Sequence, residues 1–423
     1  MKFGLDLAPL RVSAPYRRLY VSGLVTNLGS QATYVTVAFQ MKQISHSPLA
    51  VGLIGLVELL PLIVFGLYGG VVADHFNRRR VILMSEAALM CGALMLFVNA
   101  LRDAPSTWVL YVVIVFTTMA DGIQRPSLDA LNQQVIPHEL QRSASTLNMM
   151  RYTLGAIVGP ALGGLISVGP GPHLVYLIDV VTFGVSLAFL YGVRAPLMTQ
   201  SEGHPSLSSL FDGVRYAVSR RDLLGTYLVD LAAMMLAFPI TMLPFIAEHF
   251  SEPYALAVLY AATPTGAMLA SATSRWTDRL HFYGRAIAVA ASLWGVGIAV
   301  FGWSPWLWLA ATGLAFAGGA DAISAVLRGA TWNMSIPPSV RGRMAGIELL
   351  SYSVGPTAGQ FRAGAMTAAL GVRTSLAIGG IACAATCAAL PVVLPAMWRF
   401  DVRTDENVAE VRRIRSEEGA PES

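Results

Sequence analysis

Apolar stretches recur from one end of the chain to the other, and they restrict its fold more than any other feature. A helix needs ~20 predominantly apolar residues to cross a bilayer. Only 13% of the 423 residues are charged, against roughly 25% in soluble globular chains. We therefore expect an all-α membrane protein with about twelve transmembrane helices. The expected spans are residues 19–40, 49–73, 81–101, 107–126, 144–168, 173–193, 222–246, 253–274, 284–302, 305–328, 343–369 and 374–396.

Positive residues gather in alternate connecting segments, which predicts the orientation of the chain. Most of the 29 lysines and arginines fall there, including the run 78–80 and the pair at 220 and 221. Such segments stay in the cytoplasm. We expect a multi-pass protein of the cell (inner or plasma) membrane with both termini cytoplasmic. No cleavable leader pattern precedes the first span, so we expect that span to be retained. The basic balance then reflects topology and not nucleic-acid binding.

The two halves of the sequence resemble each other after a shift of 200 residues. The shift aligns Asp121 with Asp321, Tyr152 with Tyr352, and Gly155, Gly159 and Gly164 with Gly355, Gly359 and Gly364. Parallel six-helix repeats are one known transporter plan, with a substrate site between the repeats. We expect a six-helix bundle over 1–193, a cytoplasmic linker with an amphipathic helix over 194–221, a second bundle over 222–398, and a cytoplasmic tail over 399–423.

The segment after the second expected span contains a glycine, an acid and a basic cluster at fixed spacing. It reads Gly70-Val-Val-Ala-Asp74-His75-Phe-Asn77-Arg78-Arg79-Arg80. The glycine allows helices to approach, the carboxylate suits a helix N-terminus or an arginine, and the basic cluster can hold a gate by breakable contacts. The alternative is an ordinary positive-inside loop.

This segment resembles motif A of the major facilitator superfamily, although His75 replaces a basic residue and Asn77 replaces a glycine. Asn tolerates the left-handed conformation that a tight turn can require. A second, weaker copy ends in Asp278-Arg279, with Ser274 in place of its glycine. The resemblance implies the major facilitator fold, with two pseudo-symmetric six-helix bundles. It also implies a cytoplasmic gate, formed by Gly70, Asp74, Arg78, Arg79, Asp278 and Arg279.

A glycine-rich face in the fifth expected span resembles the antiporter motif of facilitator-type exporters. Its residues are Gly155, Gly159, Pro160, Gly163 and Gly164. Glycines every four residues permit close helix packing, and the proline permits a bend. Generic small-residue packing is the alternative interpretation.

Segments over nearly the whole chain, among them Tyr16–Tyr20, Val51–Pro61, Gly225–Asp230 and Pro337–Arg343, are similar to a branch that includes enterobactin exporters and macrolide efflux proteins. This resemblance implies a secondary transporter that exports hydrophobic or amphipathic small molecules, drugs or siderophores, by proton antiport. The alternatives are an uptake or facilitated carrier for a metabolite and, from another class, a membrane-embedded lipid-modifying enzyme.

Two carboxylates fall near the middle of expected spans. Burying an ionisable group there costs about 2.5–3.5 kcal/mol or more, so such residues are functional candidates. We expect Glu58 and Asp230 to act as reversible proton carriers. A structural hydrogen bond to a neighbouring helix is the alternative for each.

Other polar and polarizable residues in the spans form two further groups. An interhelical ion-pair network is expected nearer the cytoplasmic ends, from Asp121, Arg125, Arg151, Asp321 and Arg328. A substrate cavity is expected from Asn27, Gln31 and Tyr34 at helical spacing, with Met234 and Phe238 as a polarizable wall. Interhelical hydrogen bonding is the alternative for the first three of these, and core packing for the last two.

The sequence contains no pattern that indicates catalysis or a bound group. It has no Asp-x-x-Asp cluster, phosphate-binding loop or paired histidine motif. The three cysteines lie in apolar stretches and indicate packing residues. We expect a protein that is not an enzyme, has no cofactor or metal, interacts with small-molecule substrate, protons and membrane lipid, and functions as a monomer.

Overall fold

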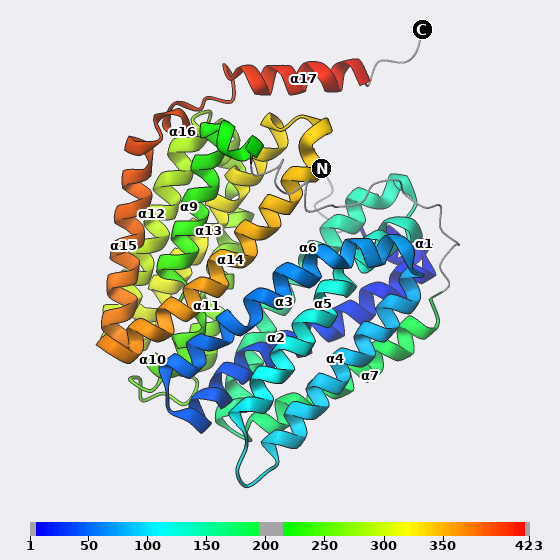
Figure 1. Cartoon of the computed structure of the whole chain (residues 1–423), viewed down its shortest axis with the longest axis vertical. Helices are drawn as coiled ribbons and strands as arrows, with labels where there is room; N and C mark the ends of the chain where they lie inside the picture. Colours follow the sequence, from blue (N-terminus) through cyan, green and yellow to red (C-terminus); the bar gives the residue numbers. More distant parts are fainter. Residues whose placement is uncertain (1–5, 194–214, 419–423) are drawn as a thin grey trace. The chain divides into compact units, whose positions relative to one another are not determined.

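The chain folds into long α-helices joined by short turns in its computed structural model, which describes residues 6–193 and 215–418 (Figure 1). Individual side chains within 67–74, at 275 and 278, within 338–350 and at 417–418 are not described. The helices of the first part are α1 (Ala8–Val12), α2 (Ala14–Ser45), α3 (Pro48–His75), α4 (Arg78–Ala100), α5 (Thr107–Val135), α6 (Gln141–Val168) and α7 (Pro172–Tyr191). Those of the second part are α9 (Arg221–Ala237), α10 (Leu243–Ala247), α11 (Ala255–Ala272), α12 (Tyr283–Trp303), α13 (Leu307–Ser335), α14 (Pro338–Leu370), α15 (Val372–Val393), α16 (Pro395–Arg399) and α17 (Glu406–Glu418).

Polar residues at the turns determine where the first helices begin. The side chains of Ser13 and Ser47 accept hydrogen bonds from backbone N–H groups in the first turns of α2 and α3. Each bond satisfies one of the donors that a helix start leaves unpaired. The helix α2 ends at Ser45, and the next residue, His46, caps it in a left-handed conformation with φ of 50°. The helix α2 therefore extends five residues beyond residue 40, where the first span was predicted to end.

Ten helical segments in the described part of the chain are long and apolar enough to cross a membrane. The other two predicted spans correspond to α2 and α14, which have 32 and 33 residues. At 1.5 Å per residue either helix exceeds the ~30 Å hydrocarbon thickness. Their lower mean hydropathy reflects the many polar side chains that they contain. The protein is thus a multi-pass, all-α membrane protein; the number twelve stays a prediction.

The first of two compact units comprises residues 1–204 and 243–261. Within it α2 packs against both α6 and α7, α3 packs against α5, and α4 packs against α5 and α7.

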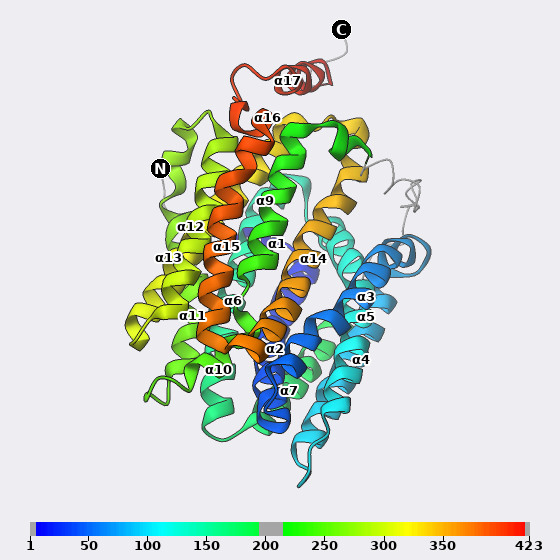
Figure 2. The same ribbon diagram turned by 60° about the vertical axis from the view of Figure 1, so that its left-hand side comes forward.

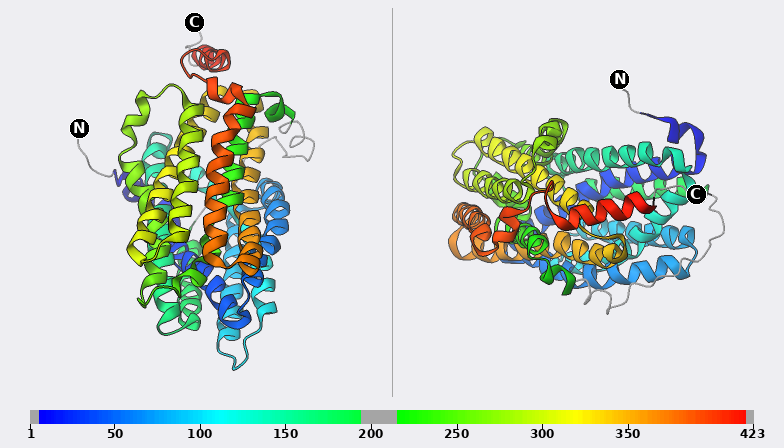
Figure 3. Two further views of the ribbon diagram at one scale, coloured as in Figure 1. Left: turned by 90° about the vertical axis from the view of Figure 1, so that its left-hand side faces the viewer. Right: turned by 90° about the horizontal axis from the view of Figure 1, so that it is seen from above.

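The second unit comprises residues 205–242 and 262–423. Within it α12 lies against α13 and α15, and α9 lies against α14 and α15 (Figure 2). The tail helix α17 runs at a steep angle to the other helices of this unit (Figure 3). Residues 194–214 of the predicted linker lie outside the described residues; residues 215–219 are helical.

The predicted span 222–246 is interrupted, which corrects the expectation of one continuous helix. The helix α9 ends at Ala237, and Phe238 is extended at φ −97° and ψ 104°. A residue before proline avoids the helical region, and Pro239 itself cannot donate a backbone hydrogen bond. A 3-10 turn (Ile240–Met242) and α10 follow. Non-helical backbone at membrane depth is tolerated where protein buries it or where it lines a cavity, and Pro239, Thr241 and Met242 are buried.

Candidate functional site

The predicted antiporter face packs against α2 through three glycines. A Cβ atom built on Gly159 would lie 2.6 Å from Gln31 Cβ, and one on Gly163 would lie 2.6 Å from the carbonyl oxygen of Ala32. A Cβ on Gly155 would collide with the side chain of Asn27. The spacing of four residues therefore brings the backbones of α6 and α2 into direct contact. Gly164 points elsewhere: its Cβ would meet the backbone of Ala257 at 3.2 Å.

The second unit contains the corresponding contact, made by glycines that the 200-residue shift aligns with the first pair. A Cβ on Gly355 would lie 2.9 Å from Met234 Cβ, and one on Gly359 would lie 3.1 Å from Phe238 Cβ. The two glycines thus pack α14 against α9 as Gly155 and Gly159 pack α6 against α2. The internal repeat of the sequence is therefore also a repeat of helix contacts. The glycines are the same in the two units, whereas the residues that face them differ.

Buried polar side chains lie beside both of these helix contacts. In the first unit the buried Arg151 precedes Gly155 by one turn, and its guanidinium occupies the space that a Cβ on Gly23 would need. The backbone carbonyl of Arg151 accepts a 3.0 Å hydrogen bond from Asn27 Nδ2. In the second unit the equivalent position is Ser351, whose hydroxyl donates to Asp230 Oδ2 at 2.8 Å. The equivalent positions therefore differ: the first unit has a buried arginine there, and the second has a serine that is hydrogen-bonded to a buried carboxylate.

Asp230 belongs to a buried polar cluster that joins α9, α13 and α14. Its Oδ1 lies 2.7 Å from Arg328 Nη2, and the two residues are 2% and 3% exposed. Arg328 Nη1 donates to Ser324 Oγ at 2.9 Å. Both carboxylate oxygens and two guanidinium nitrogens are thereby paired, as buried charges require. The predicted proton carrier Asp230 and the predicted network member Arg328 thus form one ion pair.

An aromatic stack packs at the cytoplasmic side of this ion pair in the predicted orientation. Tyr227 and Trp332 stack with ring centroids 4.8 Å apart and planes at 20°. Trp332 Nε1 donates to Thr226 Oγ1 at 2.9 Å, and its ring also contacts Tyr352 with centroids at 5.8 Å. Large rings from three helices thus pack together about one turn from the Asp230–Arg328 pair.

The remaining predicted network members are distributed over both units. Asp121 and Arg125 form an i,i+4 ion pair on α5 at 2.8 Å, with side chains 37% and 67% exposed. Glu58 on α3 lies close enough to both for their charges to interact. In the second unit Asp321 lies two turns before Arg328 on α13 and interacts with its charge. The described ion pairs are Asp121–Arg125 within the first unit and Asp230–Arg328 within the second, and a network among the predicted members stays a prediction.

The predicted cavity residues make mostly interhelical contacts. Asn27 and Gln31 face the glycines of α6, and Met234 and Phe238 face those of α14. Tyr34 is 36% exposed. Asn27 makes an interhelical hydrogen bond to the carbonyl of Arg151, which is the alternative that was left open for this residue. A cavity-lining role for all five residues stays a prediction.

The predicted gate segment joins α3 to α4. Asn77 has φ −62° and does not adopt the left-handed conformation that asparagine tolerates. Its Oδ1 instead accepts a 3.2 Å hydrogen bond from the backbone N–H of Arg80 and caps α4. Arg79 Nη2 donates to the carbonyl of Tyr191 at 2.6 Å, at the end of α7. A cation at a helix C-terminus is favourable.

Two gate residues, the side chains of Asp74 and Asp278, lie outside the described part of the chain. Of the others, Gly70 lies within α3, Arg78 is partly exposed near the start of α4, and Arg279 is exposed at the end of the 3-10 turn η3 (Ser274–Arg279). Their role in a gate stays a prediction.

Sequence reasoning missed a buried lysine at the end of α2. Lys42 is 7% exposed, its Nζ donates to the carbonyl of Pro244 at 2.6 Å, and it forms an ion pair with the exposed carboxylate of Glu248. Its ammonium also lies 5.2 Å from the ring centroid of Phe245. The residue falls just beyond the predicted end of the first span, where a lysine is normally solvated. Lys42 lies inside α2, because this helix extends beyond the predicted end of the span, and the sequence therefore did not indicate that the lysine is buried.

Two further buried carboxyls were visible in the sequence without an assigned role. Glu86 Oε1 accepts from Gln124 Nε2 at 3.1 Å. Asp179 accepts from Thr33 at 2.7 Å and from Thr182 at 3.2 Å. These polar partners come from other helices or from the next turn of the same helix. The spacing of polar residues along a single helix does not indicate such partners.

Comparisons with known proteins agree with this architecture. The family described as transmembrane secretion effector matches residues 5–416. The chain is 26% identical over 400 residues to the enterobactin exporter EntS of Shigella flexneri, covering 94% of this chain and 95% of that protein. It is likewise 26% identical over 402 residues to EntS of Citrobacter koseri, with the same coverage.

Solved transporters share the fold at low sequence identity. The nucleoside transporter NupG superposes with a TM-score of 0.72 at 14% identity, over 92% of this chain and 100% of that chain. The POT family transporter PepTSo gives 0.72 at 13% identity, over 92% and 99%. With a family match over nearly its whole length, the chain belongs to the transmembrane secretion effector family of the major facilitator superfamily, whose members are multi-pass membrane transporters.

Proposed function

We propose that this protein exports hydrophobic or amphipathic small molecules of the siderophore or drug type from the cytoplasm. The observation that carries the proposal is its similarity to enterobactin exporters over 94% of its length. The glycine face of α6, which resembles the antiporter motif, favours the same direction. Uptake or facilitated passage of a metabolite is the alternative. The protein would work as a monomer in the cell (inner or plasma) membrane.

Proton antiport by alternating access is the mechanism that the buried charges favour. Asp230 is paired with Arg328, so a proton can replace the arginine as the partner of this carboxylate when the helices separate. A carboxyl that is protonated in one conformation and ionised in another couples proton movement to the conformational cycle. Glu58, beside Asp121 and Arg125, is the corresponding candidate in the first unit.

The two six-helix bundles over 1–193 and 222–398 would be the moving parts, with both termini and the linker 194–221 in the cytoplasm. Reporter fusions near residues 18, 79, 206 and 403 should then all report cytoplasm. A periplasmic result at 206 would contradict the two-bundle arrangement. Asp74→Asn should lower transport sharply while insertion stays normal, because the amide keeps the shape of the gate residue and loses its charge.

Accumulation in inside-out vesicles distinguishes export from uptake. Vesicles from cells that express the protein should concentrate enterobactin or members of a varied amphipathic panel when their interior is acidified. Gly184→Ala is the matched control, because a Cβ at this exposed position meets nothing within 4 Å. Vesicles that concentrate no compound, while right-side-out vesicles do, would favour the uptake alternative.

A further inference from the structure

Arg151 is a buried arginine of the first unit that the proposed mechanism does not use. It is 4% exposed on α6, ten residues or ~15 Å from the start of that helix. Its Nη1 lies against the backbone of Gly23 on α2, where a Cβ would collide with it. The glycine therefore makes room for a guanidinium between two helices. A charge buried there is unfavourable unless a partner neutralises it.

No described carboxylate pairs with this charge. Arg151 Nε is buried without a hydrogen-bond partner, and none of the described ion pairs includes the guanidinium. Asp129 on α5 is close enough for the two charges to interact, but it is exposed and forms no ion pair with Arg151. Asp74, whose side chain is not described, stands one residue before the end of α3. In the predicted topology that position is ~13 Å nearer the cytoplasm than Arg151.

The sequence repeat offers a comparison within the molecule, because the second unit pairs its buried charge at the equivalent place. The position aligned with Arg151 is Ser351, which donates to Asp230, and Asp230 forms an ion pair with Arg328. The two residues of the first unit that align with this pair are uncharged. Buried arginines in proteins are nearly always paired. The second unit supplies such a partner from its own helices, and the described residues of the first unit do not.

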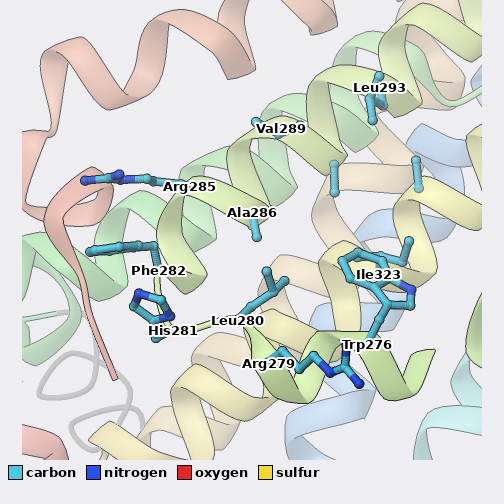
Figure 4. A pocket seen from close by; sticks show the side chains of 12 residues that line it. Trp276, Arg279, Leu280, His281, Phe282, Arg285, Ala286, Val289, Leu293 and Ile323 are labelled. Carbon is cyan, nitrogen blue, oxygen red and sulfur yellow. The ribbon is translucent and has the colours of Figure 1, made fainter. Parts of the chain in front are cut away.

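Arg285 in the second unit shows how the chain itself can satisfy an arginine. Its guanidinium lies 4.1 Å from the ring centroid of Phe282 and 5.4 Å from that of Trp398. Its Nε donates to the carbonyl of Trp398 at 3.1 Å. The guanidinium is turned away from a neighbouring cavity of about 410 Å³, whose walls are almost wholly apolar (Figure 4). Arg285 is thus held by the chain, whereas Arg151 lacks an equivalent set of partners.

The surroundings of Arg151 indicate which kind of anion fits. Its guanidinium lies 5.2 Å from the ring centroid of Tyr152, whose side chain is 56% exposed. A buried guanidinium offers charge-assisted hydrogen bonds to an oxyanion, and its planar fork matches the two oxygens of a carboxylate. The exposed ring beside it offers an aromatic face to the rest of a ligand. Asn27, predicted to line the substrate cavity, donates to the Arg151 carbonyl from the facing helix.

We propose that Arg151 binds the carboxylate of an aromatic, amphipathic organic anion whose ring lies on Tyr152. This inference rests on the proposed export function and deepens it, because it names acidic compounds as the preferred substrates. A neutral compound of the same shape would leave the buried charge unpaired and would bind more weakly. A small inorganic anion would pair with the charge but would leave the Tyr152 ring uncovered.

Binding of 2-naphthoate and 2-naphthamide tests this assignment, because the two probes have the same rings and differ in charge. The purified full-length protein in neutral detergent is titrated with each probe by isothermal calorimetry at neutral pH. Arg151→Met should weaken naphthoate binding about 10- to 100-fold and leave naphthamide binding unchanged. Arg151→Lys, which keeps the charge without the planar fork, should retain part of the preference for naphthoate. Tyr152→Ala should weaken both probes by the same factor, about two- to tenfold.

Arg142→Met is the matched control, because it removes an exposed arginine from the same helix. It should leave both titrations unchanged. Equal affinity of the parent protein for the two probes, or an equal loss of naphthoate binding in Arg142→Met and Arg151→Met, would overturn the proposal. Displacement of naphthoate by inorganic phosphate at similar concentrations would identify a site for small anions and would overturn the aromatic assignment.

Thermal unfolding without ligand gives a second readout that does not depend on the probes. A buried charge without an internal partner does not stabilise the fold, so Arg151→Met should melt no lower than the parent protein. A melting temperature well below that of the parent would mean that Arg151 has a partner within the chain, and would overturn the proposal. Transport in inside-out vesicles separates this inference from the export function. Export without a preference for naphthoate over naphthamide would refute the inference alone, whereas selective binding without export would refute the export function alone.

Discussion

Replacing Asp230 by asparagine removes one charge of a buried pair and leaves the other. The paired atoms are 2.7 Å apart. At an effective dielectric constant of about 20, two unit charges at that distance attract by ~6 kcal/mol. Desolvation of both ions offsets much of this attraction, so the pair contributes little net stability. In Asp230→Asn, however, Arg328 stays buried without a counter-charge, and the expected loss is ~3–5 kcal/mol.

Thermal unfolding of a double-mutant cycle measures this loss. For a domain of about 200 residues each kcal/mol shifts the melting temperature by ~2–4 °C. Asp230→Asn and Arg328→Met should each melt about 6–20 °C below the parent protein. The double variant should melt higher than either single variant, because no unpaired buried charge remains. If the two losses simply add, the residues do not act as a pair and the reasoning from the geometry is wrong.

Transport by the same variants separates a structural from a coupling role. Uphill efflux driven by a pH gradient should be lost in Asp230→Asn, and it should stay lost in the double variant although stability recovers. Substrate binding should persist in both. A stable double variant that still concentrates substrate under a pH gradient would exclude Asp230 as an essential proton carrier.

Three further changes test other parts of the molecule. Glu58→Gln should abolish pH-driven efflux and preserve substrate binding, measured in the same vesicles; retained uphill transport would leave Glu58 a structural residue. Gly159→Ala should cost ~1–3 kcal/mol of stability and Gly159→Leu more, because an added Cβ would lie 2.6 Å from the nearest side-chain carbon of α2; melting temperatures equal to that of Gly184→Ala would refute the close contact. Lys42→Met should lower the melting temperature more than Glu248→Gln does, since the lysine is buried and the glutamate side chain is 70% exposed; equal effects would mean that the ion pair alone matters.

Features that repeat along one helix were predictable, and partners on other helices were not. Glycines four residues apart indicated a close-packed face, and the face exists at Gly155, Gly159 and Gly163. The spacing did not indicate that Asn27 and Gln31 would face these glycines, because a single sequence does not define which residues of two helices come into contact. For the same reason Asp230 and Arg328 were assigned to different roles.

Two local features of the backbone were not predicted from the sequence. The helix break at Phe238 was visible as a residue before a proline, but the apolar run through residue 246 outweighed it in the prediction of a span. Asn77 stands where motif A has a glycine, and its side chain caps the start of α4 by accepting a hydrogen bond from a backbone N–H group. In both cases the local backbone conformation depends on hydrogen bonding and on proline, which a hydropathy pattern does not show.

The matched glycine contacts of the two units bear on how such a protein can change its buried side chains without changing its helix packing. The contacts fix how closely two backbones approach, and a glycine meets that demand whatever residue stands across from it. The first unit places amides opposite its glycines and the second places a thioether and a phenyl ring. Mutation can therefore alter the polarity of α2 and α9 while the helix spacing is kept, so side-chain chemistry and mechanical fit can evolve at different positions in the chain.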